Sequence, residues 1–477
     1  MINQKEKMDT ICAIATPAGG ALGIIRVSGP EAITAADRIF RPRVGVPLNQ
    51  RAASSLTFGN VVVPQTDEAV DEVLVSLFRS PHSYTGEDSV EFSCHGSYYI
   101  LNKVVELLLA QGCRMARPGE YTERAFLNGK MDLSQAEAVA DLIASTTEAN
   151  HRMAMQQMRG GFSKELRTLR DQLLHITSLL ELELDFSDHE ELEFASRPEL
   201  LALAERIRNH ISTLCQSFRL GNALKRGVPV ALVGETNAGK STLLNALVGE
   251  ERALVSNVHG TTRDTIEETV NVGGTLVRFI DTAGIRETSD TVERMGIERT
   301  FDKMAEADIV LWLIDLTAYQ AQYDELAEKI GAQVQGKQLV VLLNKTDLVS
   351  ESTINEAKQY ISGQLNNAVP TPMLLTLSAQ SGSGLDQLKQ LLAASLSTLQ
   401  AENNSTGTIV SNLRHYEALS AALAATDRVI EGLHQGLSGD FVSQDLRECI
   451  YHLSDIVGEV TTDQVLGNIF KHFCVGK

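Results

Sequence analysis

The sequence predicts a multidomain α/β protein in which one α/β domain is inserted into a helical domain. Three features carry this prediction: short β-branched runs near the N-terminus, two helical stretches far apart in the chain, and apolar strand-like runs between them. A length of 477 residues is enough for about three domains. The predicted segments are residues 1–118, 119–223, 224–390 and 391–477, with the second and fourth forming one discontinuous helical domain.

The N-terminal segment, residues 1–118, has the pattern of a small α+β domain. The runs GIIRVSG, SLTFGNVVV and EVLVSLF are rich in β-branched residues and are separated by Gly and Pro turns. A helix-like stretch, KVVELLLAQG, follows them. We therefore expect a sheet with a few packed helices.

The helical segments are indicated by a cap and by periodicity. Asp132 and Gln135 have the spacing of a capping box at the start of DLSQAEAVADLIAS. Apolar residues then recur at spacings of three and four, namely Leu166, Leu169, Leu173, Ile176 and Leu180. After the polar stretch 401–407, the helical pattern returns with HYEALSAALAATDRVIEGL. One bundle interrupted by an inserted domain explains both stretches, because insertions are tolerated at exposed loop tips.

The inserted segment, residues 224–390, predicts a doubly wound parallel sheet. Its apolar runs are VPVALVG, TLVRFID, IVLWLID, QLVVLLN and MLLTLSA. Near-continuous apolar strands alternating with helical segments are typical of parallel strands covered on both faces.

Composition limits the possible classes of protein. The N-terminus lacks a signal-peptide pattern and no apolar run reaches membrane-spanning length, so we expect a soluble cytoplasmic protein without a membrane partner. The six cysteines have no CxxC spacing, which argues against a zinc site or a disulfide framework. A net charge of −19 excludes a broad basic surface, so a nucleic-acid partner needs a local patch or a second protein.

The strongest chemical signal is GETNAGKS, residues 234–241. Its glycines let backbone N–H groups wrap a phosphate, Lys240 can reach the β- and γ-phosphates, and Ser241 can ligate Mg²⁺. A strand-like run precedes the motif and a helix-like run, TLLNALVG, follows it, as a P-loop requires. The predicted nucleotide contacts here are Asn237, Ala238, Gly239, Lys240, Ser241 and Thr242.

Guanine recognition is predicted from NKTD, residues 344–347, after the strand QLVVLLN. The carboxylate of Asp347 can accept from guanine N1–H and the 2-amino group, a donor pair that adenine lacks. Asn344, Lys345 and Thr346 would support the base. The SAQ at Ser378, Ala379 and Gln380 would bring a backbone N–H to the guanine oxygen.

Two further motifs predict a nucleotide-dependent switch. In GTTRD, residues 260–264, Thr262 would complete the Mg²⁺ ligands and follow the γ-phosphate. The second motif is DTAG, which comprises Asp281, Thr282, Ala283 and Gly284. Asp281 would hold the metal through groups bound to it, and the Gly284 N–H would donate to the γ-phosphate. Ile285 stands where small Ras-like GTPases carry a water-orienting glutamine. The motifs together predict a Ras-like GTPase domain with another group orienting the water.

A resemblance to a known family covers essentially the whole chain. The GTPase motifs, the opening ATPAGGALGIIRVSGP, the stretch RPGEYTERAFLNGKMDLSQAEAVADLI and the terminal FCVGK together resemble the tRNA modification GTPase MnmE (TrmE) family. GTPase motifs alone would not distinguish this family from ribosome-assembly GTPases, whereas the N-terminal stretches and the CxGK end do.

The resemblance implies a potassium-activated GTPase that dimerises through its GTPase domains, with K⁺ where other systems place an arginine finger. Asn237, Ser256, Val258 and Thr261 match the family's K⁺ ligands, although Thr236 replaces a usual proline and Ser256 a frequent threonine. The matching loop that contacts the nucleotide is Ser256, Asn257, Val258, His259, Gly260, Thr261 and Thr262.

The resemblance also supplies the group that would orient the attacking water. Glu287 matches the family's catalytic glutamate. Taken from the residues alone, Glu287 can equally be a solvated charge, and Arg263 and Arg286 are rival candidates for a cis arginine.

For the N-terminal domain, the resemblance implies binding of 5-formyltetrahydrofolate and a constitutive homodimer. Arg26, Glu91, Lys130 and Lys477 are the matching folate residues, with Glu91 suited to the pterin N3–H and 2-amino group. Without the resemblance, a strand-edge arginine, a solvated glutamate and a turn lysine explain the first three. Cys474 is a candidate nucleophile or a free tail cysteine.

The implied function needs a second protein. A flavoprotein of the MnmG type would supply FAD in a heterotetramer that installs an aminomethyl or carboxymethylaminomethyl group on C5 of the tRNA wobble uridine. The alternative function is a ribosome-assembly GTPase, which would carry a basic RNA-binding appendage after the GTPase domain. Here that place is taken by a helical segment without a basic cluster.

Overall fold

The computed structural model describes residues 9–185, 197–249, 268–280, 304–365, 372–403, 408–460, 462–471, 473 and 475–476. The chain forms two compact units. One comprises Met1–Ile143, Gln156–Ser196 and Gly436–Lys477, and the other Ala144–Met155 and Arg197–Gln435. In these described ranges, no helix is both long and apolar enough to cross a bilayer.

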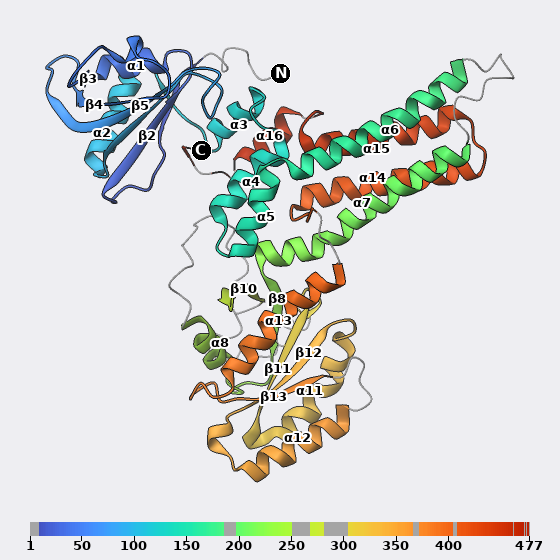
Figure 1. Cartoon of the computed structure of the whole chain (residues 1–477). Helices are drawn as coiled ribbons and strands as arrows, with labels where there is room; N and C mark the ends of the chain where they lie inside the picture. Colours follow the sequence, from blue (N-terminus) through green and yellow to red (C-terminus); the bar gives the residue numbers. More distant parts are fainter. Residues whose placement is uncertain are drawn as a thin grey trace. The chain divides into compact units, whose positions relative to one another are not determined.

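The first unit begins with a seven-stranded sheet (Figure 1). Its strand order is β3-β4-β5-β6-β2-β1-β7. The strands are β1 Ile11–Ile14, β2 Leu22–Ser28, β3 Phe40–Pro42, β4 Ser55–Val62, β5 Ala69–Phe78, β6 Ser89–His95 and β7 Arg114–Met115. Helices α1 (Ala32–Ile39) and α2 (Tyr98–Ala110) bury one face of the sheet. On the opposite face, Phe58 and Leu74 are paired in register and exposed. The predicted α+β domain is confirmed.

Helix α3 (Glu120–Leu127) is fixed to β1 and β7 by buried charges. The Arg124 guanidinium donates to Asp9 Oδ1 at 2.5 Å and to Glu120 Oε1 at 3.0 Å. Arg114 donates to the same two carboxylates, at 2.6 Å each. The side chains of Arg124 and Glu120 are only 8% and 2% exposed. Burial acts to raise the pKa of Glu120, but the hydrogen bond from Arg114 and the Arg117 N–H outweigh it and lower the pKa.

The remaining helices of this unit follow the predicted pattern. At the start of α4 (Leu133–Ala144), the Asp132 N–H donates to Gln135 Oε1 at 2.9 Å and the Gln135 N–H to Asp132 Oδ1 at 3.0 Å, which confirms the capping box. Helix α6 (Gly161–Asp185) buries the whole predicted apolar seam. It packs against α15 (Gly439–Val457), where Arg447 pairs with Glu181 at 2.7 Å. The last helix is α16 (Asp463–Phe470).

The second unit contains another helix pair and the inserted α/β domain. Helix α7 (Arg197–Arg226) packs against α14 (Leu413–His434), where Phe218 stacks on Tyr416 with ring centroids 4.4 Å apart. Both helix pairs, α6–α15 and α7–α14, join segments that precede and follow the α/β domain in the chain. The predicted insertion is therefore confirmed. Helix α5 (Glu148–Met158) lies where the chain passes between the two units.

The α/β domain has a six-stranded sheet in the order β13-β12-β11-β8-β10-β9. Its strands are β8 Val228–Val233, β9 Glu268–Val272, β10 Thr275–Ile280, β11 Ile309–Asp315, β12 Gln338–Asn344 and β13 Met373–Thr376. All five predicted strands pair in parallel. Strand β9 is an additional antiparallel edge strand that the sequence did not predict, formed because it returns directly into β10 through a short turn.

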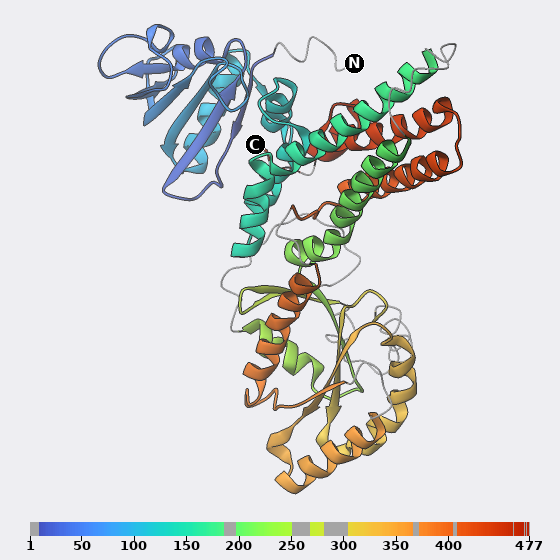
Figure 2. The same cartoon turned by 45° about the vertical axis from the view of Figure 1, so that its right-hand side comes forward.

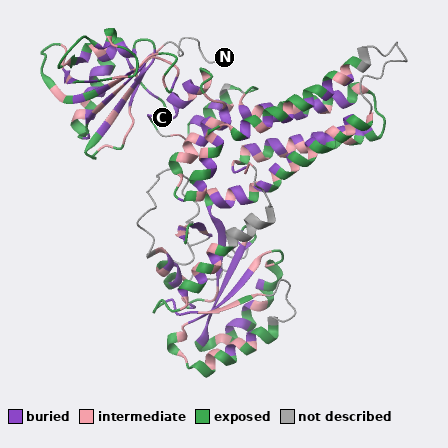
Figure 3. Cartoon of the chain, in the orientation of Figure 1, coloured by how far each residue is buried: buried purple, intermediate pink, exposed green. Residues whose placement is uncertain are grey.

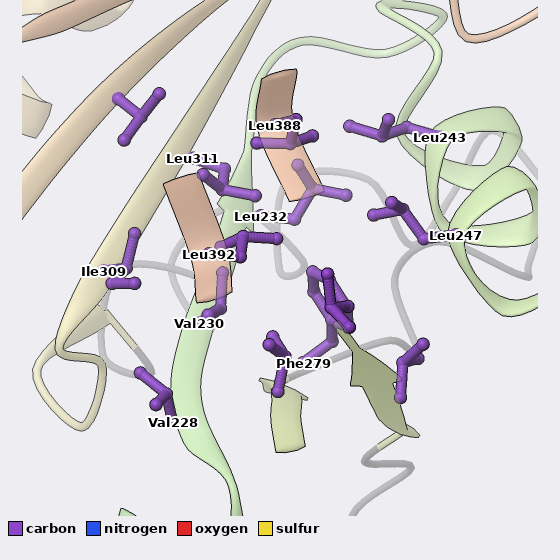
Figure 4. Packing of buried hydrophobic residues seen from close by; sticks show 14 of the residues in the cluster. Val228, Val230, Leu232, Leu243, Leu247, Phe279, Ile309, Leu311, Leu388 and Leu392 are labelled. Atoms are coloured by element: carbon purple, nitrogen blue, oxygen red, sulfur yellow. The ribbon is translucent and has the colours of Figure 1, made fainter. Parts of the chain in front are cut away.

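Helices cover both faces of this sheet (Figure 2). Helices α8 (Lys240–Gly249) and α13 (Leu385–Asn403) pack on one face, and α11 (Tyr319–Gln333) and α12 (Glu351–Leu365) on the other. Figure 4 shows Val230 and Leu232 of β8 packed among Leu243 of α8 and Leu388 of α13. The central strands are buried along their length (Figure 3), as expected for a doubly wound sheet.

The segments that connect the helices to the α/β domain pack against both of them. The predicted boundaries after residues 223 and 390 lie inside α7 and α13, and Ala223 and Leu392, just outside the predicted α/β segment, also pack into the α/β core. Where the chain returns, the Val410 N–H donates to Ser217 Oγ on α7 at 3.0 Å. A Cβ on Gly221 would lie 2.0 Å from Val410 O, so only glycine allows this crossing.

Arg124→Ala tests the buried ion network of the N-terminal unit. Because the change leaves the buried Glu120 and the half-buried Asp9 as partly unpaired charges, we expect a loss of about 3–5 kcal/mol in local stability. Hydrogen exchange of peptides covering β1 and α3 measures it. Arg43→Ala is the control, since Arg43 is 66% exposed in its pair with Glu72, and such pairs contribute about 0–1 kcal/mol. Equal effects of the two changes would contradict the network's role.

Candidate active site

The phosphate-binding loop begins where β8 ends and leads into α8 at Lys240. Two glycines allow its close approach to neighbouring strands. A Cβ on Gly234 would lie 2.3 Å from Leu313 O, and one on Gly239 would lie 2.3 Å from Asn344 Nδ2. Gly239 also has φ +101°. The loop therefore sits at the carboxyl end of the sheet, with the N-terminus of α8 available for a phosphate.

The charged and polar groups of this loop have defined places. The Lys240 ammonium donates to the carbonyl oxygens of Gly234, at 2.5 Å, and Glu235, at 2.8 Å. Asn237 is exposed and has φ +63°, a conformation that asparagine tolerates better than most residues. Ser241 and Thr242 lie exposed in the first turn of α8. The predicted phosphate-binding residues are thus brought together.

A buried amide joins the phosphate loop to the two predicted base-binding loops. Asn344, the last residue of β12, donates from Nδ2 to Ala238 O at 2.7 Å. Its Oδ1 accepts from the Ala379 N–H at 2.9 Å. The NKTD and SAQ motifs and the P-loop therefore form one constellation, although they are more than a hundred residues apart in sequence at their extremes.

The other predicted base-site residues lie on the two loops that Asn344 joins to the phosphate loop. Lys345 has φ +66° and its Nζ donates to Asp315 Oδ2 at 2.6 Å. The Thr346 N–H donates to Leu377 O at 3.3 Å, and Asp347 follows, exposed, on a short 3₁₀ turn. Ser378 is buried and Gln380 exposed. Asp315 was not predicted from the sequence; its only signal is a carboxylate at the end of an apolar strand.

The switch and catalytic predictions lie outside the described residues. These are Ser256, Asn257, Val258, His259, Gly260, Thr261, Thr262, Asp281, Thr282, Ala283, Gly284 and Glu287, with the rivals Arg263 and Arg286. Of the predicted metal ligands, the described residues include Ser241 for Mg²⁺ and Asn237 for K⁺. Among the described side chains, no group of three or more His, Cys, Asp or Glu could hold a metal. A P-loop Mg²⁺ does not need such a group, because phosphates and water supply most ligands.

The predicted folate residues Arg26 and Glu91 lie opposite one another on β2 and β6. Arg26 Nε donates to Glu91 Oε1 at 2.8 Å, so these two groups pair with each other in this structure. Two tyrosine rings flank the guanidinium, Tyr84 and Tyr121, each with its centroid 5.5 Å from Arg26 Cζ. The tyrosines were not predicted, because their proximity depends on strands and a helix distant in sequence.

Lys130 and the C-terminal segment next to Lys477 make contacts in the same unit. Lys130 Nζ donates to Pro81 O at 2.9 Å, in the loop that carries Tyr84. Near the C-terminus, Gly476 O accepts from Arg26 Nη1 at 3.4 Å. A Cβ on Gly476 would lie 2.6 Å from Ile14 O, so the tail fits here as glycine. Cys474 and Lys477 lie outside the described residues.

Comparisons with known proteins match both units of the chain. The family model "GTP-binding protein TrmE N-terminus" matches residues 10–130, and the model "MnmE helical domain" matches residues 133–474. A tRNA modification GTPase MnmE of Bacteroides fragilis strain YCH46 is 58% identical over 98% of this chain and 99% of its own length. The corresponding protein of Phocaeicola vulgatus is 53% identical over 100% of both chains.

Among solved structures, Era in complex with MgGDPNP and a segment of 16S ribosomal RNA is 26% identical, covering 42% of this chain and 66% of that chain with a TM-score of 0.28. The family assignment rests on the full-length relatives and the two family models. The chain belongs to the MnmE family of tRNA modification GTPases.

Proposed function

We propose that this GTPase uses Mg²⁺ and K⁺ to hydrolyse GTP and acts with an FAD-carrying flavoprotein of the MnmG type in the cytoplasm. The pair would install an aminomethyl or carboxymethylaminomethyl group on C5 of the tRNA wobble uridine, with a one-carbon unit from 5-formyltetrahydrofolate. Membership of the family supports the tRNA part. The observation that carries the nucleotide part is the Asn344 amide, which holds the phosphate and base loops together.

The roles in the nucleotide site follow from charge and hydrogen bonding. Lys240 and the N–H groups at the start of α8 would hold the β- and γ-phosphates, and Asp347 would accept from the guanine. Ser241 and Thr262 would hold Mg²⁺, and Asn237, Ser256, Val258 and Thr261 would hold K⁺. The ions supply positive charge near the phosphate oxygens. Glu287 would orient the attacking water, since the Ile285 side chain cannot hydrogen-bond.

Charged and apolar residues of the N-terminal unit support a folate site and a homodimer. Glu91 would pair with the pterin after releasing Arg26, and Arg26, Lys130 and Lys477 would face the polar groups of the folate. The exposed apolar residues Phe58 and Leu74, with Leu56, support a homodimer interface on this part of strands β4 and β5. In the tRNA complex, the flavoprotein would supply much of the basic surface, since this chain carries a net charge of −19.

Asp347→Asn tests guanine recognition. The change removes a carboxylate that accepts two hydrogen bonds, each worth about 1.5–3 kcal/mol when one partner is charged. We therefore expect affinity for GDP to fall by at least about 100-fold. Xanthosine diphosphate should gain affinity instead, because the new amide can donate to its 2-oxo group. Calorimetric titration with both nucleotides measures the change. A parallel loss of both nucleotides would contradict the assigned contact.

Asn237→Gly tests the potassium site. Glycine keeps the positive φ of this position but lacks the side-chain oxygen. We expect the ratio of GTP turnover in K⁺ to turnover in Na⁺ to fall towards one, while GTP affinity stays within a few-fold of the original.

Glu287→Ala tests the residue assigned to the attacking water, with GTP turnover measured in K⁺ and in Na⁺. It should abolish hydrolysis while GTP still binds, because the residue is assigned to the water and not to the nucleotide. If the original protein turns over GTP equally fast in K⁺ and Na⁺, the potassium assignment is wrong.

Glu91→Gln tests the folate site. Loss of the carboxylate weakens the pairing with the pterin donors, so we expect affinity for 5-formyltetrahydrofolate to fall by about tenfold or more, as for one charge-assisted hydrogen bond. Fluorescence or calorimetric titration measures it. Glu72→Gln is the matched control, an exposed glutamate on the neighbouring strand β5. Unchanged affinity in Glu91→Gln would remove this residue from the site.

A further inference from the structure

Asp315 makes an ion pair with the lysine of the guanine motif. It is the last residue of β11, directly beside Asn344 in the register of the sheet, and its side chain is 9% exposed. Asp315 Oδ2 accepts from Lys345 Nζ at 2.6 Å. The other oxygen, Oδ1, accepts from the Thr317 N–H at 2.9 Å and from Thr317 Oγ1 at 2.7 Å. Both oxygens are therefore occupied and the carboxylate has one orientation.

The backbone around this carboxylate is also fixed. The Asp315 N–H donates to Oε1 of Gln322, a buried residue of α11, at 2.8 Å. Burial acts to raise the pKa of Asp315, but the hydrogen bonds from Lys345 and Thr317 outweigh it and lower the pKa. The group is thus a fixed negative charge at neutral pH. Its place at the end of β11 is set by the core and not by the nucleotide.

Lys345 occupies a particular place in the guanine motif. It lies between Asn344, which binds the P-loop and the SAQ loop, and Asp347, which would read the base edge. Its positive φ turns the chain sharply at this point. A free lysine side chain has many rotamers and loses that freedom when a ligand orders it. Here the ion pair holds the ammonium at one end, so the methylene stem is ordered before any ligand arrives.

We propose that Asp315 is a positioning residue for guanine nucleotides: it holds Lys345 extended, so that the lysine stem forms one wall of the base pocket. The methylene stem of a lysine can cover an apolar surface, here a face of the purine, while its charged head stays paired. This inference rests on the proposed guanine site. Asp315 is expected to contribute to the affinity for guanine nucleotides and not to the choice between bases, because Asp347 is the residue assigned to the base edge.

Titration of the purified full chain with GDP and with inosine diphosphate tests the proposal. Asp315→Asn should weaken binding of both nucleotides by about tenfold, which is about 1.4 kcal/mol, and leave their affinity ratio unchanged. Asp324→Asn is the matched control, because Asp324 lies exposed on α11 and accepts from Tyr360 at 2.9 Å away from the motif. A change of less than twofold in Asp315→Asn, or an equal loss in the control, would overturn the proposal.

A double-mutant cycle separates positioning from a general structural role. Lys345→Met keeps a stem but cannot be held by Asp315, so it should lose about as much affinity as Asp315→Asn. Adding Asp315→Asn to Lys345→Met should then cause no further loss. If the two losses add instead, Asp315 acts through the Thr317 turn or Gln322, and the proposal is wrong.

The same variants distinguish failure of this inference from failure of the guanine site. If Lys345→Met and Asp347→Asn both leave GDP binding unchanged, the guanine site itself is misassigned, and the proposal falls with it. If both weaken binding and Asp315→Asn does not, the site stands and only the positioning role is overturned. The buried Trp312 on the same strand reports the folding of each variant through its fluorescence. Should Asp315→Asn not fold, a wild-type affinity in Lys345→Met still overturns the proposal.

Discussion

The buried amide of Asn344 is the contact on which the nucleotide site depends. A single side chain satisfies a carbonyl of the phosphate loop and an N–H of the SAQ loop. Neither loop has a regular secondary structure at this point. Because Asn344 is the last residue of β12 and bonds to both loops, the position of β12 sets the distance between them. That strand is held in turn by apolar contacts on both faces of the sheet. The distance between the candidate phosphate and base sites is therefore set by the hydrophobic core. A ligand that needs that distance meets a surface that is already arranged.

In the N-terminal unit, ion pairs hold the elements around the candidate site. Arg124 anchors α3 to Asp9, just before β1, and Glu120 anchors it to Arg114 on β7. Tyr121 lies between Glu120 and Arg124 on the same helix. The Tyr121 hydroxyl donates to Arg26 O at 2.8 Å, and its ring flanks the Arg26 guanidinium. The helix that the buried ions hold is thus the helix that positions the candidate folate arginine. Buried ion pairs are weak sources of net stability, so their value here lies in orientation.

Local sequence patterns were sufficient to predict much of this fold. Contacts between residues far apart in the sequence could not be predicted from them. The capping box of Asp132 and Gln135 needs residues three apart, and the apolar seam of α6 needs one helix, so both could be read from sequence. The parallel strands were visible because burial on both faces makes them apolar throughout. By contrast, Arg124 and Asp9 are separated by 115 residues, and neither residue type marks the other as its partner.

The candidate sites show the same division. Each of the P-loop, NKTD and SAQ motifs is a short run of consecutive residues, so each could be identified from the sequence. The structure brings the three runs together at one end of the sheet. The pairing of Arg26 with Glu91 and the ion pair between Asp315 and Lys345 depend on strand order, which no local pattern encodes. Strand β9 was missed for a related reason, since half-exposed edge strands lack the continuous apolar run of the central strands.

The crossing of Val410 over Gly221 has a topological consequence. The chain leaves α7 at Arg226, and five residues of helix rise only about 7.5 Å. The α/β domain thus begins and ends close to one point on α7, and the α7–α14 pair closes a long loop around it. Loop-closure entropy grows only with the logarithm of length, at about 0.6 kcal/mol per doubling. The entropy cost of closing the α7–α14 pair therefore depends little on the length of the inserted segment. Leu220 and Leu224 of α7 pack into the α/β core, so an insertion of any length has to keep a surface that covers them.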